Sequence, residues 1–159
     1  MASAKRKPTA LKSSGELLVL EDFLPYRLSI LSNRVSRAIA ARYADAFGLT
    51  IPEWRIIAVL GRRPGLTAKD VAEATEMDKV AVSRAVAKLV EARRVATRAD
   101  RDDARKQLLS LTSTGETLHA RIAPLALATE QKLLAALRPR ERETLDDLVD
   151  KLLSAAKEL

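Results

Sequence analysis

The sequence predicts a mainly α-helical fold with one small β-hairpin. Apolar residues recur at spacings of three and four along most of the chain, as in amphipathic helices. Two short runs, residues 94–98 and 107–111, flank a polar loop in the manner of a hairpin. Aromatic residues make up only 3% of the 159 residues, so aliphatic side chains and alanine must form the core, which suits packed helices.

The first predicted helix covers residues 22–47 and follows a basic stretch, residues 1–16, that lacks periodicity and is expected to be a disordered tail. Gly48 is a natural end for this helix, because glycine readily adopts the left-handed backbone found there. The apolar face of the helix is formed by residues at spacings of three and four: Leu24, Leu28, Leu31, Val35 and Ile39.

Two capping signals start the next helices. Thr50 stands three residues before Glu53, and Thr67 three residues before Asp70, as in capping boxes. The first of these helices is expected to end near Arg62, and the second to cover residues 68–75. Their predicted buried residues are Trp54, Ile57, Leu60, Val71 and Ala72.

Asp78 is a further N-cap candidate, and the helix after it is expected to end near Ala92. The predicted buried residues of this helix are Val82, Val86, Leu89 and Val90. The opposite face holds Val80, Arg84, Ala87, Lys88 and Glu91, with Ala81 and Ser83 at its flanks.

Two helices are expected after the hairpin. One covers residues 115–137, bent or offset near Pro124, and the other begins at the segment RPRERE. The apolar face of the last helix is formed by Leu145, Leu148, Val149, Leu152, Leu153 and Ala156.

The order of helix, short helix, tight turn, helix and hairpin is that of a winged helix-turn-helix. The small side chains of Val80, Ala81 and Ser83 would let the third helix approach a major groove closely. Arg84 could then reach guanine or a phosphate, and Lys88 a phosphate. An ordinary solvated helix face is the alternative, and the adjoining hairpin favours the DNA-binding interpretation.

The hairpin loop is densely charged: from Arg98 to Lys106 every residue is charged except two alanines. Basic residues on a stiff two-stranded stem could enter a minor groove. We expect Asp100 or Asp103 to pair with Arg101 or Arg98 and to accept loop N–H groups; a merely hydrophilic hairpin tip is the alternative. The candidate DNA contacts of this wing are Arg101, Arg105 and Lys106, and its candidate supporting residues are Asp103 and Arg98.

Composition limits the function classes. The net charge is +7, and the basic excess lies in residues 1–112, which favours double-stranded DNA as a partner. The chain has no cysteine, which fits a reducing cytoplasm, and no apolar stretch near the length of a membrane span or signal peptide. One histidine and no glycine-rich phosphate loop argue against an enzyme, so we expect no cofactor and no metal.

Four segments resemble the MarR family of transcriptional regulators: LTIPEWRIIAVL (49–60), DKVAVSRAVAKLVEARRVATR (78–98), DARKQLLSLT (103–112) and LTSTGETLHARIAPLA (111–126). The resemblance covers residues 22–157. It implies a homodimeric regulator, more often a repressor than an activator, bound to a pseudo-palindromic operator and released by a small, often phenolic or anionic, effector. It also implies that Arg105 is the wing arginine and Asp103 its supporting acid.

The resemblance further implies a division of the chain into two regions. Residues 17–49 and 113–159 would form a helical dimerisation region, and residues 50–112 the winged helix-turn-helix. Many members of the family have glycine where this chain has Arg93, so the helix end or the strand entry is expected to differ slightly here. Arg93 could add a phosphate contact.

Four residues are candidates for binding an effector. Arg27 and Arg34 are seven residues apart on one edge of the first helix and could hold a carboxylate or phosphate. Trp54 and Arg55 could line the same cleft. Core packing is the alternative for Trp54, and salt bridging for the two arginines. Two other functions stay open for the whole chain, an architectural DNA-binding protein without an effector and a protein-interaction module on the same fold.

Overall fold

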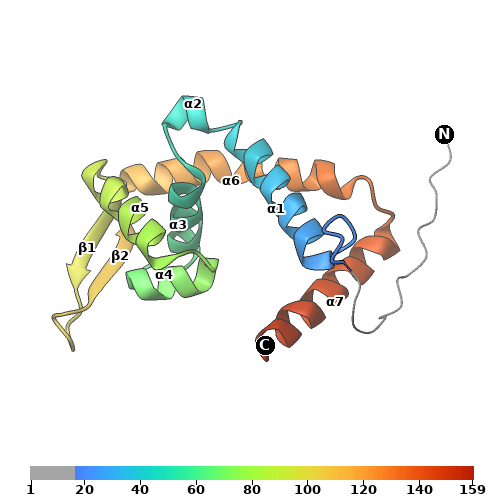
Figure 1. Cartoon of the computed structure of the whole chain (residues 1–159). Helices are drawn as coiled ribbons and strands as arrows, with labels where there is room; N and C mark the ends of the chain where they lie inside the picture. The colour runs from blue at the N-terminus through green and yellow to red at the C-terminus, as the bar shows by residue number, and fades with distance from the viewer. Residues whose placement is uncertain (1–16) are drawn as a thin grey trace. The chain divides into compact units, whose positions relative to one another are not determined.

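The computed structural model of the chain describes residues 17–159, so the tail predicted at residues 1–16 lies outside the described residues (Figure 1). The described residues divide into two compact units between Asn33 and Arg34. No helix among residues 17–159 is long and apolar enough to cross a membrane.

The prediction of a single helix over residues 22–47 is wrong, because the structure has two helices in this segment. Helix α1 covers Leu24–Ala40 and helix α2 covers Ala44–Phe47. Between them the N–H groups of Arg42 and Tyr43 donate to carbonyls only three residues back, which tightens the chain into a turn. The turn buries the Tyr43 ring, which is 1% exposed and lies 5.9 Å from the Trp54 ring. Gly48 ends α2 in the left-handed conformation, with φ of 59°.

Both predicted capping boxes are confirmed. Helix α3, Ile51–Arg62, begins where the Thr50 N–H donates to Glu53 Oε2 at 2.8 Å and the Glu53 N–H donates to Thr50 Oγ1 at 3.4 Å. Helix α4, Ala68–Thr75, begins with the same reciprocal pair between Thr67 and Asp70, at 2.8 and 3.2 Å. Each box satisfies N–H groups that have no partner within the helix.

The core lies between α3, α4, the helix α5, the hairpin and the helix α6. Helix α5 covers Lys79–Glu91 and buries Val82, Ala85 and Leu89. Val90 was predicted to be buried but is exposed, because it lies one position beyond the inward face that Val82 and Leu89 define. In α3 Ile56 is buried while Trp54 is only partly so. The buried hydrophobic cluster is Tyr43, Leu49, Ile56, Ile57, Leu60, Val71, Ala72, Val82, Ala85, Leu89, Val95, Leu109 and Ile122.

The hairpin is confirmed and has a partner that the sequence did not reveal. Strands β1, Val95–Ala99, and β2, Gln107–Leu111, are antiparallel, with Val95 opposite Leu111. On its other edge β2 bonds to the segment before α4, because the Leu109 N–H donates to the Leu66 carbonyl at 2.8 Å and the Gly65 N–H donates to the Leu109 carbonyl at 2.8 Å. The stem of the hairpin is therefore bonded to the segment that leads into α4.

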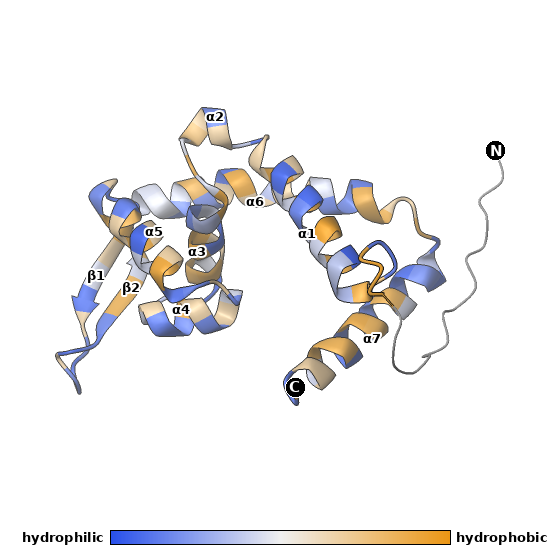
Figure 2. Ribbon diagram, viewed as in Figure 1, coloured by the Kyte–Doolittle hydropathy of each residue, from blue (hydrophilic) through white to orange (hydrophobic). Residues whose placement is uncertain are grey.

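Two helices complete the chain. Helix α6 covers Ser113–Leu134 and continues through Pro124, and helix α7 covers Pro139–Ala156. Helices α1 and α7 bury none of their side chains within the single chain. Figure 2 shows that α7 carries a run of apolar residues along its length. Its most exposed apolar side chains are Leu145, Leu148, Val149, Leu152 and Leu153.

Candidate nucleic-acid interface

Helix α5 presents a face of small and basic residues to solvent. Val80 is 56% exposed, and Ser83, Arg84 and Lys88 are exposed as well, while Ala81 is half-buried. The opposite face is fixed in the core by Val82 and the other buried residues of the helix. The outward face is therefore held on a packed helix, and its small residues at 80, 81 and 83 leave room for a close approach of its backbone to another molecule.

The first turn of α5 is capped by a carboxylate. Asp78 Oδ1 accepts the N–H of Val80 at 2.9 Å and the N–H of Ala81 at 3.0 Å. These bonds satisfy two of the N–H groups that begin a helix. An anion approaching α5 must therefore bind to its side chains rather than to these two backbone groups.

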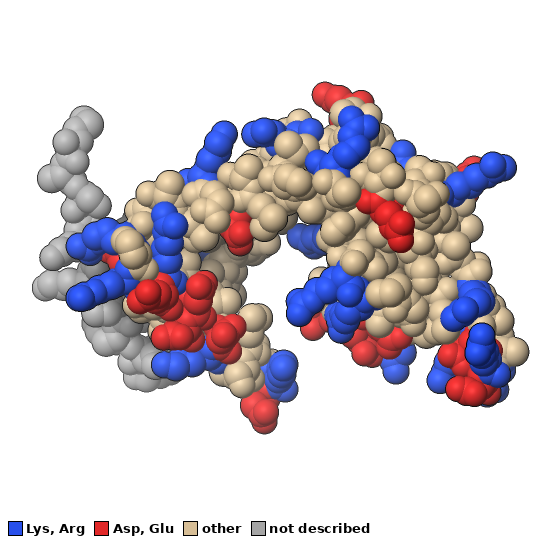
Figure 3. All heavy atoms as spheres, turned by 180° about the vertical axis from the view of Figure 1, so that it is seen from behind, with Lys and Arg blue, Asp and Glu red and all other residues tan. Residues whose placement is uncertain are grey.

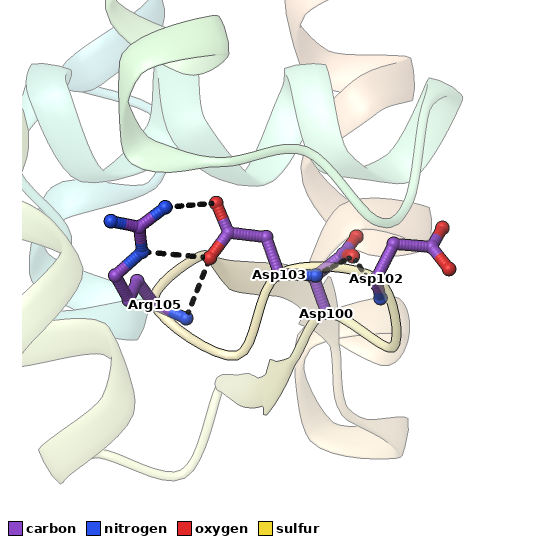
Figure 4. Close-up of polar contacts among 4 residues, drawn as sticks. All are labelled: Asp100, Asp102, Asp103 and Arg105. Atoms are coloured by element: carbon purple, nitrogen blue, oxygen red, sulfur yellow. Dashed lines mark hydrogen bonds and ion pairs between the residues drawn. The ribbon is translucent and has the colours of Figure 1, made fainter.

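The loop at the end of the hairpin is shaped by two aspartates (Figure 4). Asp100 Oδ1 accepts the N–H groups of Asp102 and Asp103, at 2.8 and 3.1 Å. These two backbone bonds lower the pKa of Asp100 below its ordinary value. The prediction that wing aspartates accept loop N–H groups is confirmed.

Asp103 pairs with Arg105, as the resemblance to the MarR family implied, and not with Arg101 or Arg98, which the charges of the loop had also suggested. Its Oδ1 accepts the Arg105 Nε–H at 3.0 Å and the Arg105 backbone N–H at 3.2 Å, and the Arg105 side chain is 92% exposed (Figure 4). The side-chain bond from Arg105 is the main cause that lowers the pKa of Asp103, and the backbone bond adds to it. Arg105 Nη2 also donates to Asp103 Oδ2 at 3.5 Å, so both carboxylate oxygens hold the guanidinium while the side chain remains exposed to solvent.

The other predicted wing residues have different surroundings. Lys106 closes the loop through its backbone, since its N–H donates to the Asp103 carbonyl at 2.8 Å and its carbonyl accepts the Asp100 N–H at 2.9 Å. The pKa of Asp70 is lowered mainly by its hydrogen bonds with Thr67, and those of Asp100 and Asp103 by the loop hydrogen bonds; the Lys106 charge adds to each of these shifts. Arg101 is exposed in the loop, and Arg98 is exposed on β1. Figure 3 shows basic and acidic side chains intermixed at the end of the hairpin.

Helix α5 is followed by a left-handed residue, Arg93, at the position where many members of the similar family have glycine. Arg93 has φ of 54°. Its N–H donates to the Val90 carbonyl at 2.9 Å, and the Arg94 N–H donates to the Leu89 carbonyl at 2.8 Å, which is the bond pattern of a Schellman motif. The expected change at the helix end is therefore wrong: the chain keeps the end that glycine would allow, at the conformational cost of an arginine there.

The four effector candidates have different surroundings. Trp54 lies between Tyr43 and His119, with ring centroids 5.9 and 6.0 Å away, which favours the packing interpretation for the indole. The Arg55 guanidinium donates to Ser36 Oγ at 3.3 Å. Arg27 and Arg34 are both exposed on α1.

Helix α5 presents a face of small residues, and the adjoining hairpin carries an oriented arginine. This combination is typical of winged helix-turn-helix proteins and places the chain in that class. The sequence model described as "MarR family" matches residues 47–106. A curated relative, the HTH-type transcriptional repressor Rv2887 of Mycobacterium tuberculosis, is 30% identical over 123 residues, which cover 76% of this chain and 85% of the relative. The chain belongs to the MarR family of transcriptional regulators.

Solved structures agree with this assignment. A MarR/EmrR family transcriptional regulator from Acinetobacter sp. ADP1 is 26% identical, with a TM-score of 0.81 over 89% of this chain and 100% of that one. The MepR–DNA complex of S. aureus gives 23% identity and a TM-score of 0.74 over 84% and 98% of the two chains. PcaV of Streptomyces coelicolor, solved with its natural ligand, is 22% identical, with a TM-score of 0.73 over 89% of this chain and 99% of that one. The last two matches support the fold.

Proposed function

We propose that this regulator is a repressor that binds a pseudo-palindromic operator as a homodimer and is released by a small molecule. Helix α5 of each subunit enters a major groove, and Arg105 enters the adjoining minor groove. The observation that carries the proposal is the pairing of Arg105 with Asp103 beside the exposed face of α5. Two-fold symmetry then places the half-sites about 10 bp apart.

The division of roles within α5 follows from side-chain chemistry. Val80 and Ala81 offer methyl groups to thymine methyls, and Arg84 offers a fork of donors to guanine O6 and N7. Ser83 and Lys88 are placed to meet bases or phosphates at the edges of the same face. In the wing, Arg101 is a phosphate contact and Lys106 mainly a loop-closing residue.

The apolar faces of the terminal helices support a homodimer. Residues 17–49 and 113–159 would form the dimerisation region. In α1 Leu24, Leu28 and Leu31 are each nearly half exposed, and in α7 Leu152 and Leu153 are 48% and 60% exposed. Contiguous exposed apolar surface of this kind marks a protein contact, and a second copy buries the same faces twice through a two-fold axis.

The relatives support repression and ligand release. Rv2887 is described as a repressor, and PcaV was solved with its natural ligand. A carboxylate or phosphate group of such a ligand would be attracted to Arg27 and Arg34 on α1 or to Arg55. Ligand binding would favour a dimer geometry that no longer matches both half-sites.

The test is selection of bound duplexes from a random DNA library by the purified full chain at near-physiological salt. Enrichment of a pseudo-palindrome with one-turn spacing is the expected result. Binding without sequence enrichment, weakening steeply with salt, would instead identify an architectural DNA-binding protein. No binding by ligand-free protein would turn the proposal towards a protein-interaction module.

The wing is tested by Arg105→Ala on the selected operator. We expect about a tenfold loss of affinity, equal to about 1.4 kcal/mol, with the dimer intact. Arg98→Ala, on the exposed stem of the same hairpin, is the matched control for loss of one positive charge. Equal effects of the two substitutions would remove the special role assigned to Arg105.

A further inference from the structure

Arg94 joins two parts of the chain that are far apart in sequence. Its guanidinium Nη2 donates to the carbonyl of Phe47, 47 residues earlier, at 2.7 Å. That carbonyl belongs to the last residue of α2, where helix carbonyls have no partner within the helix. A charged donor on such an acceptor is among the stronger hydrogen bonds in proteins. The side chain is half-buried, so water competes for the bond less than at the surface.

The backbone of Arg94 is fixed at the junction of three further elements. Its N–H closes the end of α5 on the Leu89 carbonyl, and β1 starts at the next residue. Its carbonyl accepts the N–H of Thr112, the N-cap of α6, at 3.1 Å. Thr112 Oγ1 also donates to the Arg93 carbonyl at 2.7 Å. The residue therefore sits where the recognition helix ends and the wing begins.

The other end of the bond is anchored as well. The Phe47 ring packs against the core cluster, and the Arg121 guanidinium of α6 lies 4.8 Å from its centroid. An arginine over an aromatic ring at this distance is a cation–π contact. The carbonyl that Arg94 reaches thus belongs to a residue whose side chain is itself held in place.

We propose that Arg94 is a positioning residue for operator recognition. It fixes the junction of α5 and β1 relative to α2, so that the recognition helix and the wing can bind their grooves at the same time. The proposal rests on the proposed function, because it concerns the specific complex with an operator. Arg94 itself contacts no base or phosphate. Specific binding needs both elements in register, whereas non-specific binding to phosphates does not.

The experiment compares Arg94→Met with Arg62→Met in the dimer. Both substitutions remove one arginine charge, but Arg62 is exposed on α3, whereas the Phe47 carbonyl is bonded by Arg94. Affinity is measured for the selected operator and for a scrambled duplex at several salt concentrations. Arg94→Lys, which keeps a charged donor, tests rescue. Melting and dimer size are recorded first, and Arg94→Gln replaces the Met variant if that variant does not fold.

We expect Arg94→Met to lose about tenfold affinity for the operator, the order of one hydrogen bond to a charged group. Affinity for the scrambled duplex and the salt slope should stay unchanged, and Arg94→Lys should recover most of the loss. A parallel loss on both duplexes, with the slope lower by about 0.9, would show a phosphate contact and overturn the proposal.

Wild-type affinity in Arg94→Met, or in Arg94→Gln where it replaces that variant, would also overturn the proposal. In that case the side chain would only fill space between the two elements. The wild-type protein separates this failure from failure of the proposed function. If the wild-type protein shows no sequence preference, the proposed function and the role of Arg94 are both refuted. If the wild type shows a preference and Arg94→Met retains it, only the role of Arg94 is refuted.

Discussion

Substitution of Gly115 gives the sharpest test of the packing at the start of α6, because the expected sign of the change in stability is unusual. Replacing glycine by alanine inside a helix normally stabilises a protein by about 1 kcal/mol. Here a Cβ on Gly115 would lie 2.1 Å from the Arg94 carbonyl oxygen and 3.2 Å from Leu111 Cδ2. The oxygen cannot move away without loss, since it accepts the Thr112 N–H.

The magnitude follows from these contacts. Overpacking against backbone costs about 1–3 kcal/mol or more, so we expect Gly115→Ala to lower the free energy of unfolding by roughly 2 kcal/mol. For a chain of this size that is a fall in Tm of roughly 4–8 °C. The assay is thermal unfolding followed by circular dichroism at one fixed protein concentration, because the Tm of the proposed dimer would depend on concentration.

The matched control is Gly48→Ala. Nothing lies within 4 Å of a Cβ at Gly48, but its φ of 59° disfavours a side chain. This control isolates the backbone cost of about 1 kcal/mol from any steric clash. A Gly115→Ala protein that melts at or above the wild-type temperature would refute the close approach to Arg94.

Three further outcomes are expected. Asp103→Asn should weaken operator binding by about tenfold, because it releases Arg105. The pKa of Asp103 is lowered, so the wild-type carboxylate stays charged in neutral and mildly acidic solution. The difference in affinity between wild type and variant should therefore hold from about pH 8 down to about pH 5 and shrink only in stronger acid. Arg93→Gly should raise Tm by roughly 2–4 °C, since glycine removes the left-handed cost, and an unchanged Tm would contradict the strain assigned to φ of 54°. Leu152→Asp should yield monomers in sedimentation experiments while Ser154→Asp, on the opposite face of α7, should not; a dimeric Leu152→Asp would exclude this face from the interface.

Local signals predicted the elements within residues 50–112 well. The bounds of α4 and β2 match the predicted residues 68–75 and 107–111, because capping boxes and turns are determined by neighbouring residues. The N-cap Asp78 was found for the same reason. The acceptance of loop N–H groups by the wing aspartates also depends on neighbours two and three positions away.

Features that depend on distant residues were missed. The turn between α1 and α2 exists because Tyr43 enters the core beside Trp54, and nothing in the periodicity of the first helix reveals that. The bond from Arg94 to Phe47 and the bridge of Leu66 to Leu109 span 47 and 43 residues. The pairing of Asp103 with Arg105 was expected only from the resemblance to the MarR family, since the charges of the loop by themselves left Arg98 and Arg101 as candidates.

The pairing of β2 on both edges has a consequence for self-association. Strand β1 is left as the outer strand of the described hairpin, and an outer strand can recruit another chain by extending the ladder. This strand is five residues long and carries the exposed Arg98 near its end. Joining two such strands antiparallel would bring the Arg98 end of each strand towards Arg93 and Arg94 at the start of the other, which places like charges near one another. The wing thus offers its backbone edge only over a short stretch, which protects the protein against growth into fibres.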